Sequence, residues 1–90
     1  MQVRAHFYIE GNVQGVFFRR SAKMQADKLG VFGLVRNRRD GTVEIIAQGA
    51  KGKVNAFIKW CKKGPPLSKV EKVDVEWKKN LEDFDEFEVV

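Results

Sequence analysis

The sequence predicts an α+β sandwich, in which two helices cover one face of an antiparallel sheet. Several segments alternate apolar and polar residues with a period of two, which is typical of half-buried strands. Two other segments repeat apolar residues at helical spacing, and the elements follow in the order strand, helix, strand, strand, helix, strand. The 90 residues allow one hydrophobic core, so we expect a single domain over residues 1–90.

The first strand and the first helix have the clearest patterns. Apolar and polar residues alternate from Val3 to Ile9, and His6 falls on the more polar face, where we expect an ordinary paired histidine. Four apolar residues at helical spacing predict a helix from Phe18 to Leu29. Gly30 follows directly, in the position where a left-handed residue commonly ends a helix.

The remaining elements follow from the same patterns. Residues 31–36 and 42–48 are predicted strands, joined by a hairpin whose Asp-Gly pair is a strong turn signal. Apolar residues from Val54 to Cys61 predict a second helix, which ends at Gly64 and the two prolines after it. Residues 71–78 form a fourth strand, and residues 84–90 a short edge strand whose acidic side chains oppose aggregation.

This order of elements is the split β-α-β arrangement, the ferredoxin-like α/β sandwich (βαββαβ). In that topology the first and third strands form the central pair, flanked by the second and the fourth. The loop after the first strand and the end of the second strand then approach each other. Arg19 and Asn37 are therefore expected to be neighbours.

The segment from Gly11 to Arg19 is the best candidate for a binding site. Its two glycines permit a tight loop, and the amides and dipole of a helix N-terminus attract anions. Arg19 lies in the first helical turn, where a cation is unfavourable unless an anion binds nearby. The segment alone is equally compatible with a plain strand-to-helix connection, and Asn37 with the ordinary preference of asparagine for turns.

Composition restricts the class of protein. The net charge is +5, and without the five acids of residues 82–88 the first 80 residues carry a surplus of +10. That surplus favours anionic ligands, although scattered lysines also serve solubility. Cys61 is the single cysteine, no Cys/His cluster indicates zinc, and no apolar stretch indicates a signal peptide or a membrane span. We expect a cytoplasmic monomer with no metal, no cofactor and no membrane partner.

The sequence lacks several catalytic motifs, and this limits the reactions that the protein could catalyse. It has no P-loop, no dinucleotide fingerprint and no Ser/His/Asp or Cys/His set. An anion cradle, an arginine and an amide could hydrolyse only a substrate with an unusually good leaving group. A phosphate joined to a carboxylate is such a substrate, because the departing carboxylate needs little protonation.

Two long motifs of the chain resemble the signatures of the acylphosphatase family. The first is Ile9-Glu10-Gly11-Asn12-Val13-Gln14-Gly15-Val16-Phe17-Phe18-Arg19. The second is Gly33-Leu34-Val35-Arg36-Asn37, followed at the expected spacing by Gly41-Thr42-Val43 and Gly49. The stretch from Trp60 through Gly64-Pro65-Pro66 to Val70 is also similar to that family, so the resemblance covers nearly the whole chain.

The resemblance implies an acylphosphatase-like domain over residues 1–90, which hydrolyses small acyl phosphates to a carboxylate and orthophosphate without a metal. By motif position, Arg19 would bind the phosphate and Asn37 would orient the attacking water. The phosphate-binding residues would be Gly11, Asn12, Val13, Gln14, Gly15 and Val16, together with Arg19. Leu34 stands where the family usually has an aromatic residue, and Arg38 where many members have threonine. Arg38 could tighten anion binding or simply face solvent.

Two alternatives come from other classes of function. Ferredoxin-like domains with basic and aromatic sheets can bind RNA. Residues 42–48 lack the interleaved basic and aromatic residues of that signature, so we do not expect a nucleic-acid partner. A regulatory or carbamoyl-transfer module is the second alternative, because acylphosphatase-like domains also begin larger maturation enzymes. Because the sequence ends at Val90, we expect the free-standing enzyme.

Overall fold

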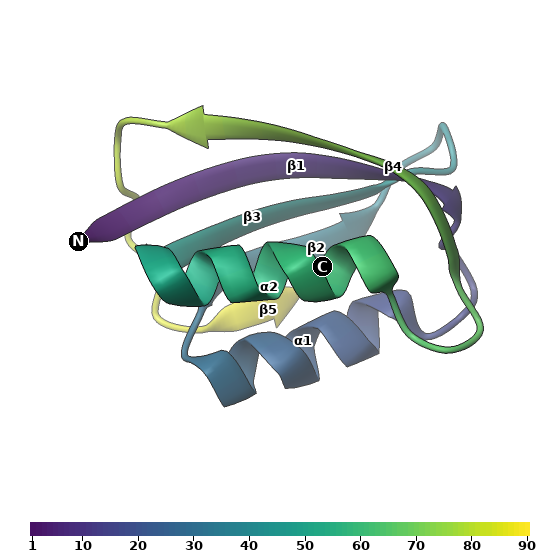
Figure 1. The fold of residues 1–90 in the computed structure, drawn as a ribbon, viewed down its shortest axis with the longest axis horizontal. Helices are drawn as coiled ribbons and strands as arrows, with labels where there is room; N and C mark the ends of the chain where they lie inside the picture. The colour runs from purple at the N-terminus through teal and green to yellow at the C-terminus, as the bar shows by residue number, and fades with distance from the viewer.

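The computed structural model describes residues 1–90 as one five-stranded sheet with both helices packed on the same face (Figure 1). The order of the strands in the sheet is β4-β1-β3-β2-β5, so the first and third strands form the central pair, as predicted. The elements in chain order are β1 (Gln2–Asn12), α1 (Phe18–Leu29), β2 (Phe32–Asn37), β3 (Val43–Ala50), α2 (Lys51–Lys63), β4 (Lys69–Lys78) and β5 (Phe87–Val89).

The first four strands form the antiparallel sheet that the sequence predicts. β1 pairs with β3 on one side and with β4 on the other, and β3 pairs with β2. The short strand β5 instead lies parallel to β2, so the complete sheet is mixed. Its direction follows from the path of residues 79–86, which leave the end of β4 and cross that same end of the sheet to the opposite edge, where β2 begins (Figure 1). Gln48 holds this crossing through two hydrogen bonds to the backbone of Glu82.

The helices have the ends that their sequences specify. α1 has the predicted bounds, and Gly30 ends it in the left-handed conformation with φ 75° and ψ 35°. α2 begins at Lys51, directly after β3 and three residues before its first buried side chain. It ends at Lys63, and the backbone N–H of Gly64 bonds to the carbonyl of Trp60. Neither helix is long and apolar enough to cross a membrane.

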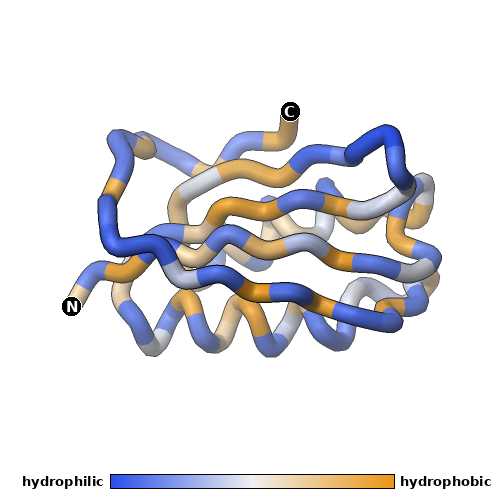
Figure 2. The backbone as a smooth tube through the Cα atoms, turned by 90° about the horizontal axis from the view of Figure 1, so that it is seen from above, coloured by the Kyte–Doolittle hydropathy of each residue, from blue (hydrophilic) through white to orange (hydrophobic).

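The core lies between the sheet and the two helices. Hydrophobic and hydrophilic residues alternate along the strands (Figure 2). The buried apolar side chains of the strands form one cluster with those of the two helices. Phe57 of α2 lies at the centre, with edge contacts to Phe7 and Phe87 at centroid distances of 6.4 and 5.4 Å. Trp60 stacks on Phe57 and contacts Phe18, which joins α2 to the first turn of α1. The residue before Arg19 is therefore fixed in the core.

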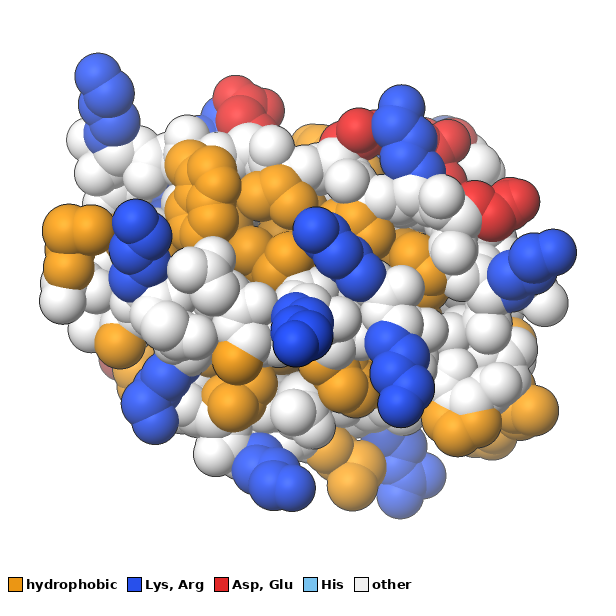
Figure 3. Space-filling view, viewed as in Figure 1, with side chains coloured by type: hydrophobic (Ala, Val, Ile, Leu, Met, Phe, Trp, Pro, Cys, Tyr) orange, Lys and Arg blue, Asp and Glu red, His pale blue; other side chains and the backbone are white.

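Charged side chains surround this core. Lys and Arg side chains are spread over the helical face, with hydrophobic groups between them (Figure 3). His6 lies on the opposite face of the sheet, where its Nε2 is 2.6 Å from a carboxylate oxygen of Glu44. It is a paired histidine, as the alternation along β1 predicts.

Candidate active site

The first turn of α1 leaves backbone amides available for an anion. Phe17 precedes the helix in the left-handed conformation, with φ 61° and ψ 24°, and no side chain caps the first turn. The backbone N–H of Ser21 donates to the carbonyl oxygen of Phe17 at 3.0 Å, and this is the first hydrogen bond of the helix. The first turn contains no acidic residue. The positive end of the helix dipole is therefore left for an external anion.

Phe17 is the one non-glycine residue with a positive φ, and its side chain is 66% exposed. The left-handed conformation costs an ordinary residue roughly 1–2 kcal/mol. Strain of this kind persists only where the surrounding structure imposes it, often at a functional site. Here buried neighbours on both sides, Val13 and Phe18, fix the loop in place.

A pocket of about 270 Å³ opens at this helix start. Arg19 and Asn37 both line it, although they come from α1 and from the end of β2. Asn37 is exposed, and its side-chain amide makes no hydrogen bond within the protein. The pocket is lined by Val13, Gly15, Phe17, Phe18, Arg19, Arg20, Asn37 and Val89, so its walls contain no carboxylate, imidazole or thiol.

Residues 11–16, which the sequence predicts to bind phosphate, take different positions relative to this pocket. Val13 and Gly15 line it, whereas Gly11, Asn12, Gln14 and Val16 do not. Gly15 has φ 73° and open space where a Cβ would lie, so its conformation is what requires glycine. Gly11 lies in a bulge of β1, and a Cβ there would come within 2.0 Å of the carbonyl oxygen of Lys69. Gly11 thus permits the close approach of β4, and its part in phosphate binding stays a prediction.

Gln14 connects the loop to the hairpin between β2 and β3. Its side-chain amide donates to the carbonyl oxygens of Arg38 and Thr42 at 2.7 and 2.9 Å. The hairpin itself is a tight loop, in which the N–H of Arg38 bonds to the carbonyl of Thr42 and Gly41 has φ 89°. The residue that follows Asn37 is thus tied to the loop that precedes Arg19.

Arg19 has one hydrogen bond in the structure, from Nη1 to the backbone oxygen of Val90 at 3.3 Å. The sequence did not predict this contact, nor the positions of Arg20, Phe17 and Val89 in the pocket wall. The doubled arginine was the only sequence signal for Arg20. The position of Val89 in the pocket wall depends on the parallel pairing of β5 with β2. No residue pattern indicates that Phe17 adopts the left-handed conformation.

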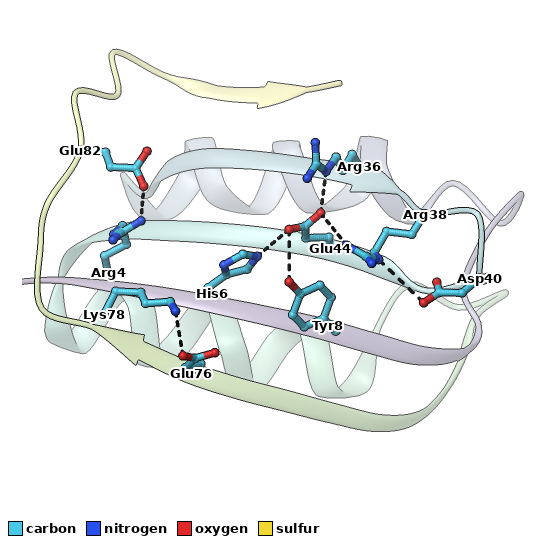
Figure 4. A network of polar contacts seen from close by, with 10 residues as sticks. All are labelled: Arg4, His6, Tyr8, Arg36, Arg38, Asp40, Glu44, Glu76, Lys78 and Glu82. Carbon is cyan, nitrogen blue, oxygen red and sulfur yellow. Dashed lines mark hydrogen bonds and ion pairs between the residues drawn. The ribbon is translucent and has the colours of Figure 1, made fainter.

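A buried carboxylate lies on the face of the sheet opposite the helices, near the hairpin between β2 and β3 (Figure 4). Glu44 of β3 is 3% exposed and accepts hydrogen bonds from Arg36 Nε at 2.5 Å, His6 at 2.6 Å and, more weakly, Arg38 Nη1 and Tyr8 at 3.5 Å (Figure 4). Burial alone raises the pKa of Glu44, but the hydrogen bonds and charges of Arg36 and His6 outweigh it and lower the pKa to about 2. Glu44 is therefore ionised at neutral pH.

The fold and the pocket together define a class of protein: a small ferredoxin-like domain whose pocket, at an uncapped helix start, is lined by two arginines, an asparagine and no nucleophile. Comparison with known proteins places the chain within that class. The sequence profile of the acylphosphatase family matches residues 5–89. The acylphosphatase of Pyrobaculum islandicum is 49% identical over 89 residues, which cover 98% of this chain and 94% of that protein. The chain belongs to the acylphosphatase family.

Solved structures agree with this assignment. The crystal structure of acylphosphatase from Bacillus subtilis matches with a TM-score of 0.95 and 39% sequence identity, covering 100% of this chain and 99% of that one. Full-length HypF, in a phosphate- and nucleotide-bound form, matches with a TM-score of 0.88 and 26% identity. That match covers 100% of this chain but only 12% of HypF.

Proposed function

We propose that this acylphosphatase holds the phosphoryl group of its substrate with Arg19 and the loop of residues 11–16, and that Asn37 orients the attacking water. The observation that carries the proposal is the meeting of Arg19, Asn37 and the uncapped start of α1 in one pocket. The enzyme is a hydrolase that cleaves the carboxyl–phosphate bond of acyl phosphates to a carboxylate and orthophosphate.

In this proposal the phosphoryl oxygens accept hydrogen bonds from Arg19 and from backbone amides at the start of α1. A guanidinium matches two phosphoryl oxygens at once and remains charged throughout. These donors are fixed before the reaction, so they stabilise charge on the equatorial oxygens without reorganising. Phe18, which is buried beside Arg19, keeps the arginine backbone in place.

Asn37 would hold the water on the side of the phosphorus opposite the leaving group. As the water oxygen bonds to phosphorus, the bond to the acyl oxygen breaks and its electron pair leaves with the carboxylate. No acid is needed, since a carboxylate is stable as an anion. No carboxylate or imidazole that could act as a general base lines the pocket, so one proton of the water passes to a phosphoryl oxygen of the substrate.

The test is hydrolysis of benzoyl phosphate by the purified protein in EDTA. We expect activity in the wild type and a loss of roughly a hundredfold in kcat/KM, or about 3 kcal/mol, in Arg19→Gln and in Asn37→Ala. Lys28→Gln on α1 and Asn55→Ala on α2 are matched controls, because both side chains are exposed and lie outside the pocket. Full activity in Arg19→Gln or Asn37→Ala would contradict the assigned role.

Inorganic phosphate provides a second measurement. We expect it to inhibit competitively and to perturb the amide signals of residues 13–20 in an NMR titration, because these residues surround the pocket. Perturbation confined to another surface would contradict phosphate binding by the loop of residues 11–16. A small acyl phosphate as the natural substrate, a monomeric state and a cytoplasmic location remain predictions from the sequence.

A further inference from the structure

A second pocket lies on the hairpin directly beside the first. Its volume is about 480 Å³, and its lining consists of Arg36, Asn37, Arg38, Arg39 and Asp40, with no hydrophobic side chain. Asn37 lines both pockets, so one amide separates the uncapped start of α1 from a group of three arginines. A ligand that reaches past Asn37 from the first pocket enters the second.

Two of the three arginines are held in place from behind. Arg36 Nε donates to Glu44 at 2.5 Å, and Arg38 Nη1 lies 3.5 Å from the same oxygen (Figure 4). The Arg38 guanidinium also lies over the ring of Tyr8, 5.1 Å from its centroid. Each contact uses only part of a five-donor group, so the remaining N–H groups of these preorganised arginines are available for an anion.

The charges favour an anion on the Asn37 side of the hairpin. The three arginines outnumber the two carboxylates that they contact, Asp40 and Glu44. Arg39 is exposed and has no acidic partner within 4.0 Å. Arg38 also lines a pocket on its other side, but that pocket contains Glu10, Asp40 and Asp74 and would repel an anion.

The edge of the sheet leaves this route open. The backbone pairing of β5 with β2 ends at Val35, where the N–H of Val90 bonds to the Val35 carbonyl at 3.0 Å. No strand covers the outer edge of β2 at Arg36 and Asn37. An acyl group can therefore extend over this edge while its phosphate remains at the start of α1.

We infer that Arg36, Arg38 and Arg39 bind a second anionic group, carried on the acyl part of the substrate. The preferred substrates are then acyl phosphates with a carboxylate or a further phosphate on the acyl chain, in place of simple uncharged ones. This inference rests on the proposed function, because it takes the first pocket as the phosphoryl site. The three arginines determine specificity, and none of them takes part in bond cleavage.

The test compares 4-carboxybenzoyl phosphate with 4-carbamoylbenzoyl phosphate, two rigid substrates of the same shape that differ by one charge. The measured quantity is the ratio of their kcat/KM values, in which any general effect on catalysis cancels. We expect the wild type to prefer the carboxylate, and the ratio to fall roughly threefold to tenfold in Arg39→Gln and further in Arg36→Gln/Arg39→Gln. Arg39→Lys keeps the charge and should retain most of the preference.

Lys59→Gln, an exposed substitution on α2, removes one positive charge far from the hairpin and should leave the ratio unchanged. The wild-type preference should also weaken between 20 and 300 mM salt, as the Debye length falls below roughly 10 Å. A ratio in the double variant equal to that of the wild type would overturn the inference. So would an equal fall in Lys59→Gln, because the effect would then be one of total charge.

The two proposals fail in different ways. If the wild type hydrolyses neither benzoyl phosphate substrate, the proposed function itself is wrong. If it hydrolyses both and the arginine variants keep the wild-type ratio, the phosphoryl site stands and only the second anion site is wrong. Arg39→Gln should fold normally, because Arg39 is exposed and has no ion-pair partner. Circular dichroism can check the fold of this variant.

Discussion

The side-chain amide of Gln14 donates a hydrogen bond of 2.7 Å to the carbonyl oxygen of Arg38, 24 positions further along the chain. A second bond from the same amide nitrogen reaches the carbonyl of Thr42. Gln14 therefore connects the loop before α1 to the hairpin that follows Asn37. The two sides of the proposed active site are joined by one side chain that does not line the pocket itself.

Replacement of Gln14 by alanine should loosen this connection. We expect Gln14→Ala to reduce kcat/KM by roughly tenfold, because misplacement of reacting groups is costly even when every catalytic side chain is present. Gln2→Ala at the exposed start of β1 is the control. The measurement is steady-state hydrolysis of benzoyl phosphate together with a urea titration. Unchanged activity in a folded Gln14→Ala protein would show that the connection is not needed.

Two glycines should differ sharply in their tolerance of alanine. A Cβ on Gly33 would come within 1.8 Å of the carbonyl oxygen of Ile46 in the neighbouring strand, and the φ of Gly33 is 143°. A Cβ on Gly30 meets nothing within 4 Å, although φ there is 75°. We expect Gly30→Ala to lower the free energy of unfolding by about 1 kcal/mol and Gly33→Ala by about 4 kcal/mol or more. Equal losses in urea unfolding would be the contrary result.

The pKa of Glu44 predicts a specific pH dependence of stability. Its pKa falls from an ordinary 4.5 to about 2 on folding, so the ionised form stabilises the fold above pH 4.5. That contribution is lost as the pH falls from 4.5 to about 2, because the folded protein then takes up the proton that the unfolded chain already holds. The full shift corresponds to about 3 kcal/mol.

The variant Glu44→Gln isolates this contribution. We expect it to be less stable than the wild type at pH 7 and to approach the wild type between pH 3 and pH 2, in urea titrations at each pH. Glu71→Gln, an exposed substitution on β4, should run parallel to the wild type throughout. A constant difference between Glu44→Gln and the wild type over the whole range would rule out the ion-pair explanation.

The single thiol should be inert in the folded protein. Cys61 of α2 is fully buried, and burial raises the pKa of its thiol well above the ordinary value. We expect a chromogenic disulfide reagent to label Cys61 only in denaturant. Cys61→Ala should keep its activity and lose about 1 kcal/mol of stability, as expected for the removal of one buried atom. Rapid labelling under native conditions would contradict this.

The sequence predicted the helices and the order of the central strands because those depend on local patterns. α1 has the predicted bounds, since apolar spacing and Gly30 define both of its ends. Strand order followed from the succession of elements, and it brings Arg19 and Asn37 to one pocket. The ends of β2 and β3 differ from the prediction by one or two residues, and β1 ends and β5 begins three residues later than predicted, because pairing with a neighbouring strand decides where the backbone hydrogen bonds stop.

Features that depend on contacts between distant residues could not be predicted. Glu44 was one acidic residue of an alternating strand until the register placed it opposite Arg36 and Tyr8. The double hydrogen bond of Gln14 requires the folded hairpin, and the left-handed Phe17 contradicts local preference. The parallel direction of β5 depends on the crossing path of residues 79–86, which have no regular pattern.

The position of β3 has a consequence for the kinetics of folding. β1 and β2 do not pair with each other, because β3 lies between them and pairs with both. The loop after β1 can meet Asn37 only after β3 has joined, a pairing that brings Gln2 opposite Ala50. Such distant pairings form slowly. In a refolding experiment, enzymatic activity should therefore return no earlier than the closure of the whole central sheet, and it reports on that step.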